Sequence, residues 1–131
     1  MKIFVLEDNS ERIKMFSLIL LNQEFVICNN ANDAMMVLSN RKFDRIFLDH
    51  DLGGMTFVDD SKCNNTGRHV TKLMHTTKNK DTDIVIHSWN DNGVKNMVSD
   101  LKHHKHGGNV IVLMYDTQEF MDYLTRLKDL K

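Results

Sequence analysis

Two kinds of hydrophobic pattern alternate along the chain. Five short runs of apolar, β-branched and aromatic residues each predict a buried strand, and they cover residues 2–6, 24–28, 45–49, 83–88 and 109–114. After each run, apolar residues recur at helical spacing, as Phe16 and Leu20 do after the first. The pattern therefore predicts five strands that alternate with five helices.

The strand runs lack a polar face, which is typical of a parallel sheet covered by helices on both sides. Right-handed crossovers and five repeats favour a doubly wound, flavodoxin-like α/β fold with strand order 2-1-3-4-5. We expect one such domain over residues 1–131, because no repeat, linker or low-complexity segment interrupts the pattern. Proline is absent, so glycine, asparagine and polar clusters must end the helices. We expect Ser10 and Asn32 to cap the starts of the first two helices.

Composition and charge exclude several classes of protein. Hydrophobic residues make up 41% and charged residues 27%, a balance typical of a folded chain. The 17 basic and 18 acidic residues argue against a broad nucleic-acid-binding face, and no apolar run is long enough to cross a bilayer. Acidic residues soon after the N-terminus argue against a signal peptide. We expect Cys28 and Cys63 to be reduced thiols in a cytoplasmic protein.

Candidate chemistry gathers where the predicted strands end. In open parallel sheets, ligands bind beyond the carboxyl ends of the strands, at the switch point in strand order. These ends carry acids, two histidines, a serine, an asparagine and two aromatic residues: Glu7, Asp8, Asp49, His50, Asp51, His87, Ser88, Trp89, Asn90, Tyr115 and Asp116.

The first and third strands are neighbours in the predicted order, which brings their terminal acids together. Close carboxylates share a proton or hold a hard cation, so Glu7, Asp8 and Asp49 are candidate ligands for Mg²⁺ or Mn²⁺. The alternative is that these acids only favour the positive end of a helix dipole.

His50 and His87 form the second candidate group. An imidazole can accept a proton from water or donate one to a leaving oxygen, so the pair could act on opposite sides of a phosphodiester. Asp49 or Asp51 could orient one of the rings. The alternative is a buried His87 that binds only backbone and a His50 on the surface.

Other polar groups at the same edge suit a phosphate. Ser88, Asn90 and the amides of Gly53 and Gly54 could donate hydrogen bonds to its oxygens. Residues 53–65 form a long polar connection that could close over the site as a lid, or be a tolerated surface insertion. Met55 or Phe57 in this segment could cover a base, and Trp89 could stack on one or simply pack against the protein. The remaining histidines receive no role; they are His69, His75, His103, His104 and His106.

These chain positions resemble the receiver domain of bacterial response regulators over almost the whole chain. The resemblance implies that Asp49 is the phosphoacceptor position, that Glu7 and Asp8 are the acidic pair that holds Mg²⁺, and that Ser88 is the switch hydroxyl. Receivers carry a lysine followed by a proline after the fifth strand, whereas this chain has Leu113 and Met114 there. That departure removes the usual cation that faces the phosphoryl group.

The strings DHDLGG (49–54) and HSWNDNG (87–93) resemble a divergent receiver-like family, the cyclic-phosphate-processing receivers. This resemblance implies an activity on cyclic phosphate ends or cyclic nucleotides, in a phage or anti-phage setting. We therefore hypothesise a phosphoesterase that opens a cyclic phosphodiester on a small ligand or an RNA end. His50, His87, Asp49 and Asp51 would be catalytic. The alternatives are a degenerate receiver that binds a protein partner and a cyclic-nucleotide binder without turnover.

Overall fold

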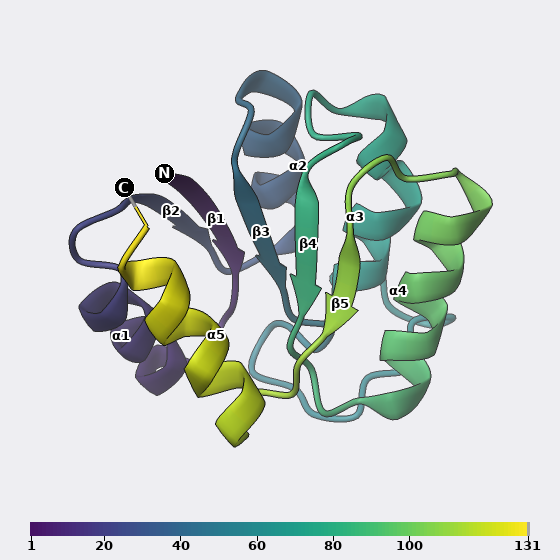
Figure 1. The fold of residues 1–131 in the computed structure, drawn as a ribbon. Coiled ribbons are helices and arrows are strands. Elements are labelled where there is room, and N and C mark those ends of the chain that lie inside the picture. Colours follow the sequence, from purple (N-terminus) through teal and green to yellow (C-terminus); the bar gives the residue numbers. More distant parts are fainter. Residues whose placement is uncertain (131) are drawn as a thin grey trace.

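The computed structural model describes residues 1–130 and contains one five-stranded parallel sheet of order β2-β1-β3-β4-β5 (Figure 1). The strands are β1 Lys2–Leu6, β2 Glu24–Cys28, β3 Arg45–Leu48, β4 Asp83–Ile86 and β5 Val110–Val112. The helices are α1 Ser10–Ile19, α2 Ala31–Asn40, α3 Gly67–Leu73, α4 Asp91–His103 and α5 Gln118–Lys128, with a short 3₁₀ helix at Met74–Thr76. The predicted fold and strand order are confirmed.

Predicted element boundaries were less accurate than the elements themselves. The last three strands end before residues 49, 88 and 114, because the chain leaves the sheet where the polar residues begin. Ser10 is not the first cap, since the Asn9 side chain accepts hydrogen bonds from the amides of Glu11 and Arg12. Asn32 is not the second cap either, since Asn30 accepts the hydrogen bond from the amide of Asp33.

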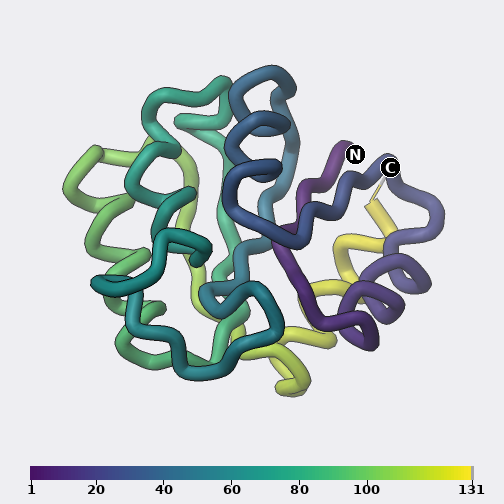
Figure 2. Tube along the Cα trace, turned by 180° about the vertical axis from the view of Figure 1, so that it is seen from behind, coloured from purple at the N-terminus to yellow at the C-terminus, as the bar shows by residue number. Residues whose placement is uncertain are grey.

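Helices cover both faces of the sheet, as the apolar strands require. Alternate strand residues such as Phe4, Ile46 and Ile84 pack under α2, α3 and α4. Their neighbours in sequence, such as Val5, Phe47 and Val85, pack under α1 and α5. Figure 2 shows α2, α3 and α4 from the side opposite to that of Figure 1. No helix within residues 1–130 combines the length and hydrophobicity needed to cross a membrane.

A buried asparagine fixes the loops at the amino ends of β3 and β4. The Asn79 side chain is fully buried and donates to the carbonyls of Leu38 and Arg41 at 2.8 and 2.7 Å. Its oxygen accepts hydrogen bonds from the Phe43 amide and the Thr82 hydroxyl at 2.8 and 3.1 Å. One side chain thus joins α2 to the connections that lead into both strands.

Replacing Asn79 with alanine should lower the free energy of unfolding by about 3 kcal/mol, because it leaves several buried polar groups without partners. Urea denaturation followed by circular dichroism measures this change. Lys78→Ala is the matched control, because that exposed side chain makes no hydrogen bond, and its effect should stay within about 0.5 kcal/mol. A loss below about 1 kcal/mol for Asn79→Ala would contradict the role assigned to it.

Candidate functional site

A cavity of about 520 Å³ lies at the carboxyl ends of the strands, at the lower edge of the sheet in Figure 1. Its lining comes from the ends of β1, β3 and β4, from the start of α1 and from the long loop after β3: Glu7, Asp8, Asn9, Ser10, Arg12, Asp49, Asp51, Gly54, Met55, Thr56, Phe57, Ser88, Trp89 and Asn90. The strand order places this cavity at the predicted switch point.

Three buried ionisable side chains meet behind this cavity. Ligand atoms of Glu7, Asp49 and His87 all lie within 4.8 Å of one another. The His87 Nε2–H donates to Glu7 Oε1 at 3.0 Å, and both side chains are fully buried. Pairing of β1 with β3, which sets Leu6 beside Leu48, is what brings the two acids together.

The two carboxyl groups of this cluster differ in protonation. Burial raises the pKa of Asp49 to about 7, and the charge of Glu7 adds to this rise while that of His87 opposes it. Burial also penalises the Glu7 carboxylate, but the hydrogen bond and charge of His87 outweigh that penalty and hold the pKa of Glu7 below its ordinary value. One negative charge is thus stable in the cluster, and a second is costly.

Arg12 supplies a cation at this site that the sequence analysis missed. Its Nη1 lies 3.7 Å from Glu7 Oε1 and 4.0 Å from Asp49 Oδ2. The guanidinium carbon lies 4.6 Å from the centre of the Tyr115 ring, a cation–π contact that holds the side chain over the acids. The available signal was its position one helical turn after Asp8, on the side of α1 that faces the strand ends.

His87 does not line the cavity. Its ring packs beside Phe16 and Phe120, with ring centres 5.5 and 6.0 Å apart. Among residues 1–130, its buried Nδ1 has no hydrogen-bond partner, so within this part of the chain Glu7 accepts the one hydrogen bond that the ring makes. The partner is a carboxylate, whereas the structural alternative considered from sequence was a backbone group.

His50 is also fully buried, between two carboxylates. Its Nδ1 lies 2.8 Å from Asp51 Oδ1 and its Nε2 lies 2.9 Å from Asp60 Oδ2. A side chain at position 93 would collide with the imidazole, which explains the glycine there. Asp60 also pairs with Arg68 at 3.0 Å, a link that no sequence motif indicated.

Asp51 anchors the loop after β3. Its carboxylate accepts hydrogen bonds from the amides of Phe57 and Val58 at 2.7 and 3.2 Å and from the Asn90 amide group at 2.9 Å. Burial of Asp51 is outweighed by these bonds and by the one from His50, so the pKa of Asp51 lies below its ordinary value. Asp51 lines the cavity as an ionised, fully engaged carboxylate.

The predicted phosphate-binding groups are divided between the cavity and the loop. Ser88 and Asn90 line the cavity, but the Asn90 side-chain NH2 already donates to Asp51 Oδ1 and to the Val58 carbonyl. Gly54 lines the cavity, and its amide donates to Asp8 Oδ2 at 2.6 Å. Gly53 lies outside the lining and takes φ +73°, a conformation that suits glycine.

The carboxylates at this site fit a hard divalent cation. Glu7 and Asp49 offer oxygen ligands at a suitable separation, and a cation would stabilise the Asp49 carboxylate against burial, which raises its pKa most, and against the charge of Glu7. Asp8, the third predicted ligand, lines the same cavity. The third member of the group whose ligand atoms lie within 4.8 Å of one another is His87, however, and not Asp8.

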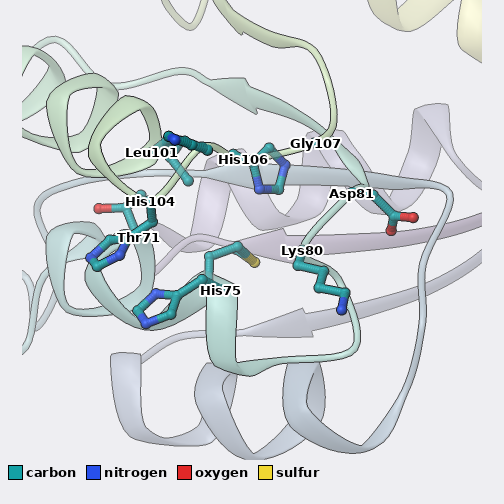
Figure 3. A pocket seen from close by; sticks show the side chains of 10 residues that line it. Thr71, His75, Lys80, Asp81, Leu101, His104, His106 and Gly107 are labelled. Carbon is teal, nitrogen blue, oxygen red and sulfur yellow. The ribbon is translucent and has the colours of Figure 1, made fainter.

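A second cavity, of about 260 Å³, lies at the amino ends of β4 and β5 (Figure 3). The rings of His75 and His104 stack there with centres 3.8 Å apart, and His106 Nε2–H donates to the Thr82 carbonyl at 2.7 Å. Within residues 1–130, three potential metal ligands gather at the opposite edge of the sheet and not here. The candidate site is therefore the first cavity.

The raised pKa of Asp49 predicts how stability depends on pH. Between the ordinary pKa near 3.8 and the folded value of about 7, the folded chain holds a proton that the unfolded chain has lost. Asp49 therefore lowers the free energy of unfolding as pH rises through this range. The asparagine in Asp49→Asn cannot ionise, so this variant escapes the loss. Without metal, the gain in free energy of unfolding of the variant over the parent should be roughly 2 kcal/mol larger at pH 8 than at pH 5.

Urea denaturation in EDTA at both pH values measures this difference. Asp122→Asn, an exposed change on α5, is the control and should behave alike at the two pH values. A difference for Asp49→Asn that does not change with pH would contradict the assignment.

Comparison with known proteins agrees with this geometry. The sequence model of the family described as "Cyclic-phosphate processing Receiver domain" matches residues 1–103. A search of curated proteins found no match.

Similar solved structures are receiver domains. The receiver domain of the sensor histidine kinase PA1611 from Pseudomonas aeruginosa PAO1, with magnesium coordinated in its active-site cleft, is 16% identical with a TM-score of 0.68 over 98% of both chains. A two-component response regulator from Clostridium difficile is 15% identical with a TM-score of 0.67, over 98% of this chain and 94% of that one. A response regulator from Burkholderia pseudomallei, with a phosphorylated aspartic acid, is 16% identical with a TM-score of 0.64 over 95% of this chain. The chain spans 65% of that protein's length.

At these identities the structural matches establish the receiver fold, and the family match covers well over half of the sequence. The chain therefore belongs to the cyclic-phosphate processing receiver domain family.

Proposed function

We propose that this protein hydrolyses a cyclic phosphodiester in the cavity at the carboxyl ends of the strands, with the help of a divalent metal ion. The observation that carries the proposal is the Arg12 guanidinium within 4.0 Å of the buried Glu7–Asp49 pair. Anionic ligands for a metal and a cation for a phosphate thus share one cavity. The family description, which names cyclic-phosphate processing, supports the same substrate class.

In this reaction a water oxygen bonds to phosphorus and one P–O bond of the ring breaks. The released ring oxygen takes the proton that water loses, so the product is a monoester. Glu7, Asp8 and Asp49 would hold Mg²⁺ or Mn²⁺, which polarises the phosphate and lowers the pKa of water. Arg12 and the Ser88 hydroxyl would bind the phosphate oxygens, whose charge rises in the transition state.

The two histidines act in this proposal through the carboxylates in front of them. His87 donates to Glu7 and fixes the position of that ligand. His50 joins Asp51 to Asp60 and thereby holds the loop that forms one wall of the cavity. We assign them to positioning, because both rings are fully buried and neither lines the cavity.

³¹P NMR with 2′,3′-cyclic nucleotides and cyclic dinucleotides tests the reaction, with Mg²⁺ or Mn²⁺ and with EDTA. We expect monoester resonances that require the metal and a rate at least about 100-fold lower in Asp49→Asn, because that change removes a metal ligand. Asp122→Asn should retain the parent rate.

Line broadening without new resonances would indicate a protein that only binds the ligand. Spectra that stay unchanged for every compound would contradict the proposal and favour a receiver that acts on a protein partner. Activity that persists in EDTA would contradict the role of the metal.

Removing the guanidinium should impair turnover with little effect on folding, since Arg12 reaches the open cavity and its side chain is still 27% exposed. We expect Arg12→Ala to lower kcat/KM about 100-fold, the usual cost of losing one charge-stabilising donor. Lys14→Ala, an exposed change on the same helix, should leave kcat/KM unchanged. Equal kcat/KM in the two variants would contradict the proposed role of Arg12 in binding the phosphate.

A further inference from the structure

Exposed apolar side chains gather at the rim of the candidate cavity. Phe57 and Trp89 are 78% and 50% exposed, and Met55 beside them is 61% exposed. All three line the cavity that holds Glu7, Asp49 and Arg12. Large apolar groups that stay in water beside a polar cavity indicate a ligand with its own apolar surface.

Phe57 is held in this exposed position at a cost to the backbone. Its φ of +51° lies in the left-handed region, which bulky residues adopt rarely and at a cost of about 1 kcal/mol or more. The hydrogen bond from its amide to Asp51 Oδ2, at 2.7 Å, fixes this conformation. His50 and Asn90 hold Asp51 in turn. A hydrogen-bond network therefore supports the strained backbone of Phe57, whose ring stays exposed.

Trp89 is also held in place. Its indole N–H donates to the Tyr115 carbonyl at 3.1 Å, so the polar edge of the ring is satisfied and half of the side chain stays in water. The guanidinium carbon of Arg12 lies 4.6 Å from the centre of the Tyr115 ring. The indole and the guanidinium are therefore anchored on one residue.

We propose that Phe57 and Trp89 form a subsite for the nucleobase of a nucleotide whose phosphate lies at Arg12 and the acidic cluster. Every base offers a flat π-face, and stacking on aromatic side chains binds it without a sequence requirement. The inference deepens the proposed function and rests on it for the place of the phosphate. It restricts the substrates to cyclic phosphates that carry a base.

Intrinsic fluorescence reports on this subsite directly, because Trp89 is the single tryptophan in the sequence. The protein is titrated with AMP in Mg²⁺, and with ribose 5-phosphate as the base-free counterpart. AMP contains no cyclic ester, so binding is measured without the proposed reaction. We expect saturable quenching with AMP and none with ribose 5-phosphate.

Phe57→Ala should raise the Kd for AMP at least tenfold, which corresponds to about 1.4 kcal/mol. Phe57→Leu should weaken binding as well, because it keeps bulk but lacks a π-face. Met36→Ala removes an exposed apolar side chain from α2, away from the cavity, and should leave the Kd unchanged. An unchanged Kd in Phe57→Ala, or equal affinity for the two ligands, would overturn the inference.

Failure of the base subsite and failure of the phosphodiesterase give different results. If the protein opened glycerol 1,2-cyclic phosphate as efficiently as 2′,3′-cyclic AMP, the subsite would be wrong and the reaction right. If AMP quenched the fluorescence of Trp89 in a Phe57-dependent manner while no cyclic ester was opened, the base subsite would be supported and the proposed hydrolysis would be contradicted.

Discussion

Two carboxyl groups are forced together at the ends of neighbouring strands, and the rest of the site compensates for their repulsion. Glu7 follows β1 and Asp49 follows β3, so the strand order itself brings them into contact. His87 makes a hydrogen bond to Glu7 from inside the protein, and Arg12 approaches both carboxyl groups from the cavity side. Burial, with a smaller contribution from the charge of Glu7, still raises the pKa of Asp49 to about 7. A cluster kept short of positive charge is well suited to a cation that arrives with the substrate.

The histidines differ from the usual arrangement of an acid–base pair. Both rings lie behind a carboxylate, and both are inaccessible to solvent. His87 is set in an aromatic environment, with Phe16 and Phe120 beside it, while His50 lies in a network of charges. The same residue type thus supports a candidate metal ligand, Glu7, in one place and the loop after β3 in the other.

The sequence predicted the strands, their order and the edge that carries the chemistry, because each follows from hydrophobic periodicity and from the rules of parallel sheets. It predicted for the same reason that the acids after the first and third strands would lie close together, with Asp8 and Asp49 as the main pair and Glu7 as an addition. In the structure, Glu7 is the acid that lies close to Asp49. It could not predict which way His50 and His87 turn, since a residue after a strand can face the cavity or the core. Arg12, Asp60 and Asn79 were missed because their contacts join different elements or loops, and which side chains meet there depends on the folded arrangement. The precise caps were missed because adjacent asparagine and serine residues are chemically alike.

Tyr115 fixes the positions of two side chains at the cavity relative to each other. Its ring carries Arg12 and its carbonyl holds Trp89, whereas the opposite wall belongs to a loop closed by the pairing of Asp51 with Thr66. The distance between cation and indole is therefore set by one residue after β5, independently of the loop. A change in the length or composition of the loop would therefore alter Phe57 but leave the Tyr115 contacts of Arg12 and Trp89 in place. In the complex that we propose, the spacing between phosphate and base and the side chain that covers the base can thus vary separately.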